Sequence, residues 1–471
     1  MPSAPPGMTA NTTMDKNTLM QNLVREAHEK GGFNGAWLYA ESGEIVSKGT
    51  IGWRDPANTL PIAEDTIFQL ASVSKQFTAT AVMLAVRQGF FGLEDKIVQY
   101  FPELTAYPDV TVRHLLTHTS GVPDYFEDDD WFVKIWTEEH RVPGNGEILR
   151  FLCETKLKPE FAPGEKISYS NTGYNLLALL VERRSGVKYE DFLQKNVFEP
   201  AGMSSTRACH IRRDGVPFEN YAQATVPENG KFVRDVDSEE DGEEVIALDG
   251  LNGDDYVYTN IYDMLKWDRA LHEGKVLTLE EQQKMYTPAK LNSGEDALYD
   301  EEDGLGYGFG WATGRDEKLG LVVSHSGGMP GVSTWFERFL DADRVLVLLC
   351  NRDYSDARAF MTCFEGMRAV AKGEEPGPVR SIEEIASQYP DKSKWESFCG
   401  RYEKLYEDFP IEEVSLKDGE LHARVVWDED DVLECRLYPL GENKFGRKGG
   451  MVEISFGEGC LTIDGTTCRK L

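Results

Sequence analysis

Strand-like runs lie at both ends of a long region whose middle is helix-like, and this arrangement constrains the fold most. GAWLYA (35–40) and EIVSKGTIGW (44–53) meet at the turn sequence ESGE, as in a hairpin. Strand patterns return in LGLVVSH (319–325), VSTWFERFL (332–340) and RVLVLLCN (344–351). Strands at the two ends with helices between them predict one antiparallel sheet built from both ends, with helices packed on it. We therefore expect an α+β fold.

A Gly, Pro and Glu cluster, AKGEEPGPVRS, divides the chain late in the sequence. The 471 residues are too many for one ordinary core. After the cluster, short alternating runs such as EEVSLKDGELHARVVW predict a small all-β sheet or barrel. We expect a flexible leader (1–18), a main domain (19–370), a linker (371–380) and a C-terminal all-β domain (381–471).

The charge balance limits the classes of partner. Lys and Arg number 50 against 81 Asp and Glu, a formal net charge of −31. Nucleic acids and anionic membrane surfaces would be repelled by this field, so neither is expected as a partner. The acidic residues form blocks at 127–130 (EDDD), 235–244 (DVDSEEDGEE) and 300–303 (DEED). Solvated loops explain such blocks, and binding of a metal or a cationic partner is the alternative.

Targeting signals and metal-ligand spacings are not seen in the sequence. The N-terminal segment lacks a basic start followed by an apolar stretch, and no run of 18 apolar residues occurs. The eight cysteines are scattered, with no CxxC pair and no histidine at ligand spacing. We expect reduced thiols, a cytoplasmic protein, and no metal or cofactor.

Two segments match Ser-x-x-Lys, and their contexts differ. Ser185 to Lys188 follows the end of a predicted helix, so we assign it to a turn. Ser72 to Lys75 opens an apolar helix-like run, where free N–H groups favour developing negative charge. Lys75 lies one turn on, and burial would lower its pKa, so that it could activate the Ser72 hydroxyl. The alternative is an N-cap serine with a snorkelling lysine.

A second segment, ISYSNTGYNLLALL, places Tyr169 and Asn171 just before an apolar helix. Tyr169 could shuttle a proton if a nearby cation lowers its pKa. Asn171 could hold Lys75 and a substrate carbonyl. Taken alone, this spacing is common in loops.

A third segment, VVSHSGGMPG, contains His325, Gly327 and Gly328 at the end of a strand-like run. Glycines there would let a substrate backbone lie against the strand edge, and a free N–H could donate to an oxyanion. His325 could tune Tyr169 or contact the substrate. The alternative is a strand end followed by a turn.

Together, the three segments resemble the signature of penicillin-recognising serine hydrolases. Longer segments, including FQLASVSKQFTA and VSHSGGMPGVSTW, resemble the class C β-lactamase-related family, especially its soluble penicillin-binding-protein and D-stereospecific peptidase or esterase members. The resemblance covers about residues 19–370. It implies a β-lactamase/transpeptidase-like domain with a cleft beside a helical subdomain, followed by a lipocalin-like barrel.

The resemblance also implies a role for each site residue. The implied roles are nucleophile for Ser72, activator for Lys75, general base for Tyr169, substrate positioning for Asn171, third-motif residues for His325 and Gly327, and oxyanion-hole N–H groups for Ser72 and Gly328.

One departure from the family pattern concerns His325, where strong β-lactamases of this group carry lysine. Histidine is mostly neutral at pH 7, so recognition of a substrate carboxylate should be weaker. We expect a metal-free serine hydrolase for a small amide, an ester or a D-residue-containing peptide, with weak or no β-lactamase activity. The alternatives are a penicillin-binding or sensing protein that hardly turns over and a non-catalytic self-assembling scaffold. Homo-oligomers are possible.

Overall fold

In this computed structural model, the described residues form two compact units. Residues 34–353 form the first unit, and residues 15–33 together with 354–471 form the second. The paired helices at 16–31 and 357–372, which the sequence pattern placed in the main domain, belong to the second unit in this division. The described ranges are 15–300, 304–406, 409–427, 432–450, 452–463 and 465–471.

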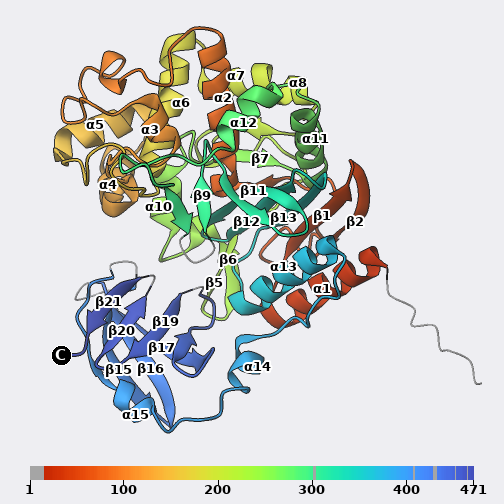
Figure 1. Cartoon of the computed structure of the whole chain (residues 1–471), viewed down its shortest axis with the longest axis vertical. Coiled ribbons are helices and arrows are strands. Elements are labelled where there is room, and N and C mark those ends of the chain that lie inside the picture. Colours follow the sequence, from red (N-terminus) through yellow and green to blue (C-terminus); the bar gives the residue numbers. More distant parts are fainter. Residues whose placement is uncertain (1–14, 301–303, 407–408, 428–431, 451, 464) are drawn as a thin grey trace, which may run out of the picture. The chain divides into compact units, whose positions relative to one another are not determined.

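An eight-stranded antiparallel sheet forms the centre of the first unit (Figure 1). β1 pairs with β13 along its length, with Leu38 opposite Val347, which confirms that both ends of the region build one sheet. The ladder between β10 and β11 ends at Ser324, so β11 continues past this neighbour over residues 325–329. In spatial order the strands are β2 (Glu44–Ile51), β1 (Gly35–Glu41), β13 (Arg344–Cys350), β12 (Val332–Phe339), β11 (Gly320–Met329), β10 (Ala312–Asp316), β9 (Leu305–Tyr307) and β8 (Leu298–Asp300).

Helix α2 (Lys75–Arg87) is deeply buried, because its first eleven residues, through Ala85, are all buried. It packs against α6 and α7, while α11 packs against β1 and β13 (Figure 1). The other helices surround this centre. They are α3 (Val112–Leu116), α4 (Asp130–Glu139), α5 (Asn145–Thr155), α6 (Asn171–Ser185), α7 (Tyr189–Leu193), α8 (Glu199–Ala201), α9 (Ile211–Asp214), α10 (Gly242–Leu248), α11 (Ile261–His272) and α12 (Leu279–Met285).

Short strands that the sequence pattern did not reveal complete the unit. β3, β7 and β4 form a small sheet, and β5 and β6 form a hairpin. Alternation cannot be recognised in strands of two to four residues, which is why these elements, like β8 and β9, escaped prediction. The bounds are β3 (Phe68–Gln69), β4 (Arg207–Ala208), β5 (Thr225–Glu228), β6 (Lys231–Arg234) and β7 (Val257–Thr259), with one-turn helices η1 (Ala71–Ser74), η2 (Ile97–Gln99), η3 (Tyr125–Asp128) and η5 (Asp235–Asp237) and a π-helical turn η4 (Gln194–Phe198).

In the second unit, α1 (Lys16–Gly31) packs against α13 (Ala357–Lys372), and an eight-stranded sheet meanders in chain order from β14 to β21. Backbone hydrogen bonds join Glu403 N–H to the Arg469 carbonyl and Leu471 N–H to the Arg401 carbonyl, so the first strand lies beside the last. The predicted small all-β domain is therefore present. Its elements are α14 (Ile382–Ala386), α15 (Trp395–Phe398), β14 (Gly400–Arg401), β15 (Ile411–Lys417), β16 (Glu420–Val426), β17 (Val432–Pro439), β18 (Lys444–Gly446), β19 (Glu453–Gly457), β20 (Cys460–Ile463) and β21 (Thr466–Arg469).

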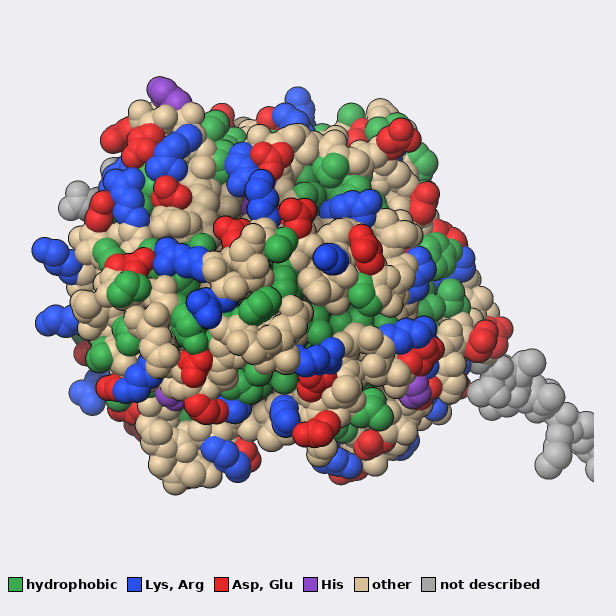
Figure 2. Space-filling view, turned by 90° about the horizontal axis from the view of Figure 1, so that it is seen from above, with side chains coloured by type: hydrophobic (Ala, Val, Ile, Leu, Met, Phe, Trp, Pro, Cys, Tyr) green, Lys and Arg blue, Asp and Glu red, His purple; other side chains and the backbone are tan. Residues whose placement is uncertain are grey.

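The acidic blocks differ in their surroundings. In the block 235–244, Glu239, Glu240 and Glu243 are exposed as expected, but Asp235 is buried and paired with Arg212. Residues 301–303 of the third block lie outside the described residues. On the face seen in Figure 2, Lys and Arg side chains are interspersed with Asp and Glu.

Among the residues that the structure describes, no helix combines the length and apolar character needed to cross a bilayer. Free thiols are found at Cys153, Cys209, Cys399, Cys435, Cys460 and Cys468.

A buried ion pair in the first unit gives a stability prediction. Arg338 donates to Asp268 at 2.7 Å, and both side chains are 3% exposed. Because Asp268→Ala would leave the Arg338 charge buried without its carboxylate, we expect the free energy of unfolding to fall by about 3–5 kcal/mol. Urea denaturation would measure this loss. The matched control is Asp109→Ala, which breaks the exposed pair with Lys96 and should cost less than about 1 kcal/mol; equal losses would contradict the prediction.

Candidate active site

Ser72 lies in the tight turn η1, and the α-helix itself begins at Lys75 rather than at Ser72. The preceding residue, Ala71, is fully buried with φ +48°, a left-handed conformation that costs energy in a non-glycine residue. Strand β7 anchors the start of this turn, because the Leu70 N–H donates to the carbonyl of Val257, the first residue of β7. The Ser72 hydroxyl is not an N-cap, since neither η1 nor α2 has a side-chain cap.

The Lys75 side chain is completely buried and joins three segments of the chain. Its Nζ donates to Ser72 Oγ at 2.9 Å, to Asn171 Oδ1 at 2.7 Å and to the Asp254 carbonyl at 3.1 Å. Burial lowers the pKa of Lys75, and nearby aspartates oppose this shift. The amine is therefore closer to losing its proton than a solvent-exposed lysine would be.

Tyr169 and Asn171 approach this lysine from the start of α6. Nζ lies 4.9 Å from the centroid of the Tyr169 ring. Burial raises the pKa of Tyr169 far above its ordinary value, against the lowering effect of a hydrogen bond with Ser72. The condition that a neighbouring cation lowers this pKa is therefore not met, because burial and nearby carboxylates raise it. Tyr169 keeps its proton at neutral pH.

His325 lies on β11 with both ring nitrogens engaged. Nδ1 lies 2.5 Å from the Ser326 carbonyl and therefore carries the proton, so Nε2 accepts the Tyr307 hydroxyl at 2.8 Å. Burial and Lys75 lower the pKa of His325 to about 3. His325 is thus neutral, and it offers neither a cation nor a spare N–H to a substrate.

Gly327 permits close contact between β11 and the turn that carries Ser72. A Cβ atom at Gly327 would lie 2.3 Å from the Leu70 carbonyl oxygen and 2.4 Å from Thr334 Oγ1. Any side chain would therefore push the strand away from the nucleophile. Gly328, the next residue, lines the same cavity as Ser72, as the two N–H groups of an oxyanion hole require.

Three carboxylates that the sequence did not single out surround the site. Asp124 accepts from the Asn171 N–H, and Asp254 accepts from the Tyr125 hydroxyl at 2.8 Å. Burial raises the pKa of Asp124 to about 6, and burial together with Asp254 raises that of Asp255 to about 7. The paired acids in GDDYVY were the available signal, but a sequence does not show that this loop reaches Lys75.

His118 was also missed, although it lies in the segment HLLTHTSGVPDY. It is buried with φ +56°, and its Nδ1 accepts the Ser170 N–H at 3.0 Å. The ring proton is therefore on Nε2, which has no hydrogen-bond partner among the described residues. The centroid of the His118 ring lies 4.3 Å from that of the Tyr169 ring and 4.6 Å from that of the Tyr307 ring. Burial holds the pKa of His118 well below its usual value.

These groups surround a cavity of about 200 Å³. Ser72, Tyr169 and Asn171 line it together with aromatic, apolar and acidic side chains. The arrangement can activate a hydroxyl for attack on a carbonyl. Within the described residues, no cluster of three or more His, Cys, Asp or Glu side chains could hold a metal ion.

A family model and a bacterial relative match most of the chain. The family model described as Beta-lactamase matches residues 20–362. Penicillin-binding protein 4* of Bacillus subtilis (strain 168) is 32% identical over 457 residues, which span 94% of each chain.

Two solved structures share the fold. The octameric penicillin-binding protein homologue from Pyrococcus abyssi matches with a TM-score of 0.66 at 21% identity, over 97% of this chain and all of that chain. The D-amino acid amidase from Ochrobactrum anthropi SV3 matches with a TM-score of 0.56 at 24% identity, over 71% of this chain and 91% of that chain.

The buried environments of His118 and His325 predict that neither imidazole gains a proton between pH 8 and pH 5. Because burial lowers the pKa of both His118 and His325, their imidazoles should stay neutral as the pH falls from 8 to 5. Proton NMR of the ring C–H signals, assigned with His118→Gln and His325→Gln variants, would follow this. A midpoint for either signal between pH 5 and 8 would contradict the prediction.

Proposed function

The chain belongs to the Beta-lactamase family, and from that premise we propose that it is a serine hydrolase that forms an acyl-enzyme on Ser72. The proposed substrates are small amides, esters and D-residue-containing peptides. The observation that carries the proposal is the buried Lys75 ammonium group, which contacts both Ser72 Oγ and Asn171 Oδ1. A snorkelling lysine would instead keep its charge in water.

The proposed reaction assigns the proton transfers from the two pKa shifts. The Lys75 ammonium group first loses a proton to water; the neutral amine then accepts the Ser72 proton as Oγ attacks the carbonyl carbon, and the N–H groups of Ser72 and Gly328 donate to the oxyanion. Tyr169, which is protonated at neutral pH, gives its proton to the leaving group and regains one from Lys75. Water then attacks the acyl-enzyme and restores Ser72. Tyr169 thus acts as a proton relay in place of a phenolate base.

The charge of the cavity favours substrates with an ammonium group. Asp254 and Asp255 line the cavity and Asp124 binds the backbone beside it, whereas His325 provides no cation. A substrate carboxylate would meet negative charge there, which supports weak or no action on penicillins. The related fold of a D-amino acid amidase supports the same substrate class.

We further propose roles for the rest of the chain. The closed meander from β14 to β21 supports a lipocalin-like barrel as the C-terminal domain, from about residue 381, after a linker at 371–380. The free thiols support the proposal that the protein works in a reducing compartment such as the cytoplasm. The octameric homologue of the same fold supports a homo-oligomer.

Replacing the nucleophile tests the proposal directly. Ser72→Ala should abolish both nitrophenyl ester hydrolysis and labelling by a fluorescent penicillin, because the attacking oxygen is lost. Intact mass spectrometry, with circular dichroism to verify folding, would measure this. The matched control is Ser185→Ala in the second Ser-x-x-Lys segment, whose hydroxyl bonds only locally to Val187. This control should retain full activity, and activity in Ser72→Ala would refute the proposal.

The acidic cavity predicts a substrate preference that depends on pH. D-alanine p-nitroanilide with its free ammonium group should have at least about tenfold higher kcat/KM than its N-succinyl derivative. The ratio should grow from pH 5.5 to 7, because Asp124 and Asp255 lose protons around pH 6 and 7 and become negative.

Steady-state kinetics with both substrates would measure this ratio. Asp255→Asn should reduce the preference, whereas the exposed Asp109→Asn should leave it unchanged. A preference for the succinylated substrate would show that the charge argument is wrong.

A further inference from the structure

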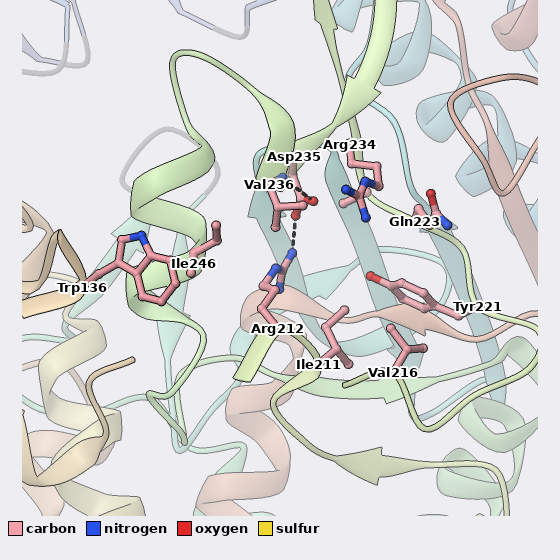
Figure 3. Close-up of a pocket in the computed structure, with 11 residues that line it drawn as sticks. Trp136, Ile211, Arg212, Val216, Tyr221, Gln223, Arg234, Asp235, Val236 and Ile246 are labelled. Atoms are coloured by element: carbon pink, nitrogen blue, oxygen red, sulfur yellow. Dashed lines mark hydrogen bonds and ion pairs between the residues drawn. The ribbon is translucent and has the colours of Figure 1, made fainter. Parts of the chain in front are cut away.

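A second cavity, of about 330 Å³, lies in the first unit and takes no part in the chemistry described above (Figure 3). We call it the Arg212 pocket. Its walls are mostly apolar: Trp136 from α4 and Ile246 from α10 form one side, and Ile211 and Tyr221 lie across from them (Figure 3). Its volume is at the low end of ligand cavities, about 300–1,000 Å³, which suits one aromatic or branched aliphatic group.

The two arginines that line the pocket already have carboxylate partners in the protein. Arg212, with its side chain 8% exposed, pairs with Asp235 and with Asp249, the latter at 3.2 Å. Arg234 pairs with Asp237 at 2.5 Å, from a side chain that is 48% exposed. A charged group that binds Arg212 would have to break a buried ion pair, at substantial cost. The pocket therefore suits an uncharged group.

Residues that line the Arg212 pocket belong to the same packed clusters and the same helix as residues at the catalytic cavity. Met329, at the end of β11, lines the catalytic cavity and packs against the cluster that contains Ile211 and Tyr221. Ala224 lines the pocket and packs against Ala71, the residue before Ser72. Helix α10 contributes Ile246 to one cavity and Leu248 to the other. A methionine side chain is flexible, so Met329 can change its conformation to admit a ligand.

We propose that the Arg212 pocket is the specificity site for an uncharged aromatic or branched aliphatic group in the acyl part of the substrate, several bonds from the carbonyl that Ser72 attacks. The proposal rests on the proposed hydrolase function. A substrate bound in this way passes Met329, with its carbonyl beside Ser72 and its apolar group against Trp136 and Tyr221. Short acyl groups do not reach the pocket.

Filling the pocket tests the proposal. Val236 is half-buried and lines the pocket, and Val187, 42% exposed on the turn after α6, is the matched control. For nitrophenyl 4-phenylbutyrate relative to nitrophenyl acetate, Val236→Trp should lower the ratio of kcat/KM values at least about tenfold, mainly through KM. Val187→Trp should leave the ratio within a factor of about two. An unchanged ratio in Val236→Trp would overturn the proposal.

A binding measurement separates failure of the pocket from failure of the proposed chemistry. In the Ser72→Ala background, 4-phenylbutyramide should bind by ligand-observed NMR, and Val236→Trp should weaken this binding at least about tenfold. If 4-phenylbutyramide binds in this way but the unmodified protein does not hydrolyse the esters, the hydrolase function is refuted and the pocket remains a binding site. If the unmodified protein hydrolyses the esters but the amide does not bind, or binds equally well to Val236→Trp, only the proposed role of the pocket is refuted.

A second filling variant protects the test against misfolding. Ile246→Trp fills the pocket from the α10 side and should reproduce both effects of Val236→Trp. Thermal melting identifies any variant that has lost its fold. If both filling variants fold and neither alters selectivity or binding, the proposal is wrong.

Discussion

The buried ammonium group of Lys75 is the interaction on which the rest of the site depends. A charge inside a protein is tolerated only when hydrogen bonds replace its water, and each of the three bonds of Lys75 reaches a different segment. Those segments are the η1 turn, the start of α6 and the loop before β7. The burial that makes Lys75 a candidate base therefore also requires the residues around it to converge. Stability and reactivity have the same origin here.

Close backbone packing sets the position of the nucleophile relative to β11. Ala71 adopts a left-handed conformation immediately before Ser72, and Gly327 leaves no room for a Cβ against Leu70. Both features hold Ser72 beside β11, at the residues of this strand that extend past β10. Left-handed residues also occur at His118 and Tyr256, which border the same site. Backbone strain of this kind persists only where surrounding contacts maintain it.

The sequence revealed those parts of the structure that depend on local pattern. The paired strands at residues 35–51 and 320–350, the helices α6 and α11 and the C-terminal β meander all follow from periodicity, and the Ser72 and Tyr169 segments from their motifs. The environment of the motifs could not be read in this way. The raised pKa of Tyr169 comes from burial, and the bond between His325 and Tyr307 depends on a strand that was not recognised.

The two cavities select different features of a substrate. The catalytic cavity selects its charge, and the Arg212 pocket selects its apolar group. Around Ser72, the carboxyl groups of Asp124 and Asp255 select substrates by charge, and their effect depends on pH because their pKa values lie near neutrality. In the Arg212 pocket, Arg212 is already paired with Asp235 and Asp249, so that selection depends on shape and on the removal of apolar surface from water. Because Met329 lines the catalytic cavity and packs against the cluster that contains Ile211 and Tyr221 of the Arg212 pocket, a substrate that occupies both cavities passes this side chain. A substrate that carries both features gains from both cavities, so its selectivity exceeds what either cavity provides alone.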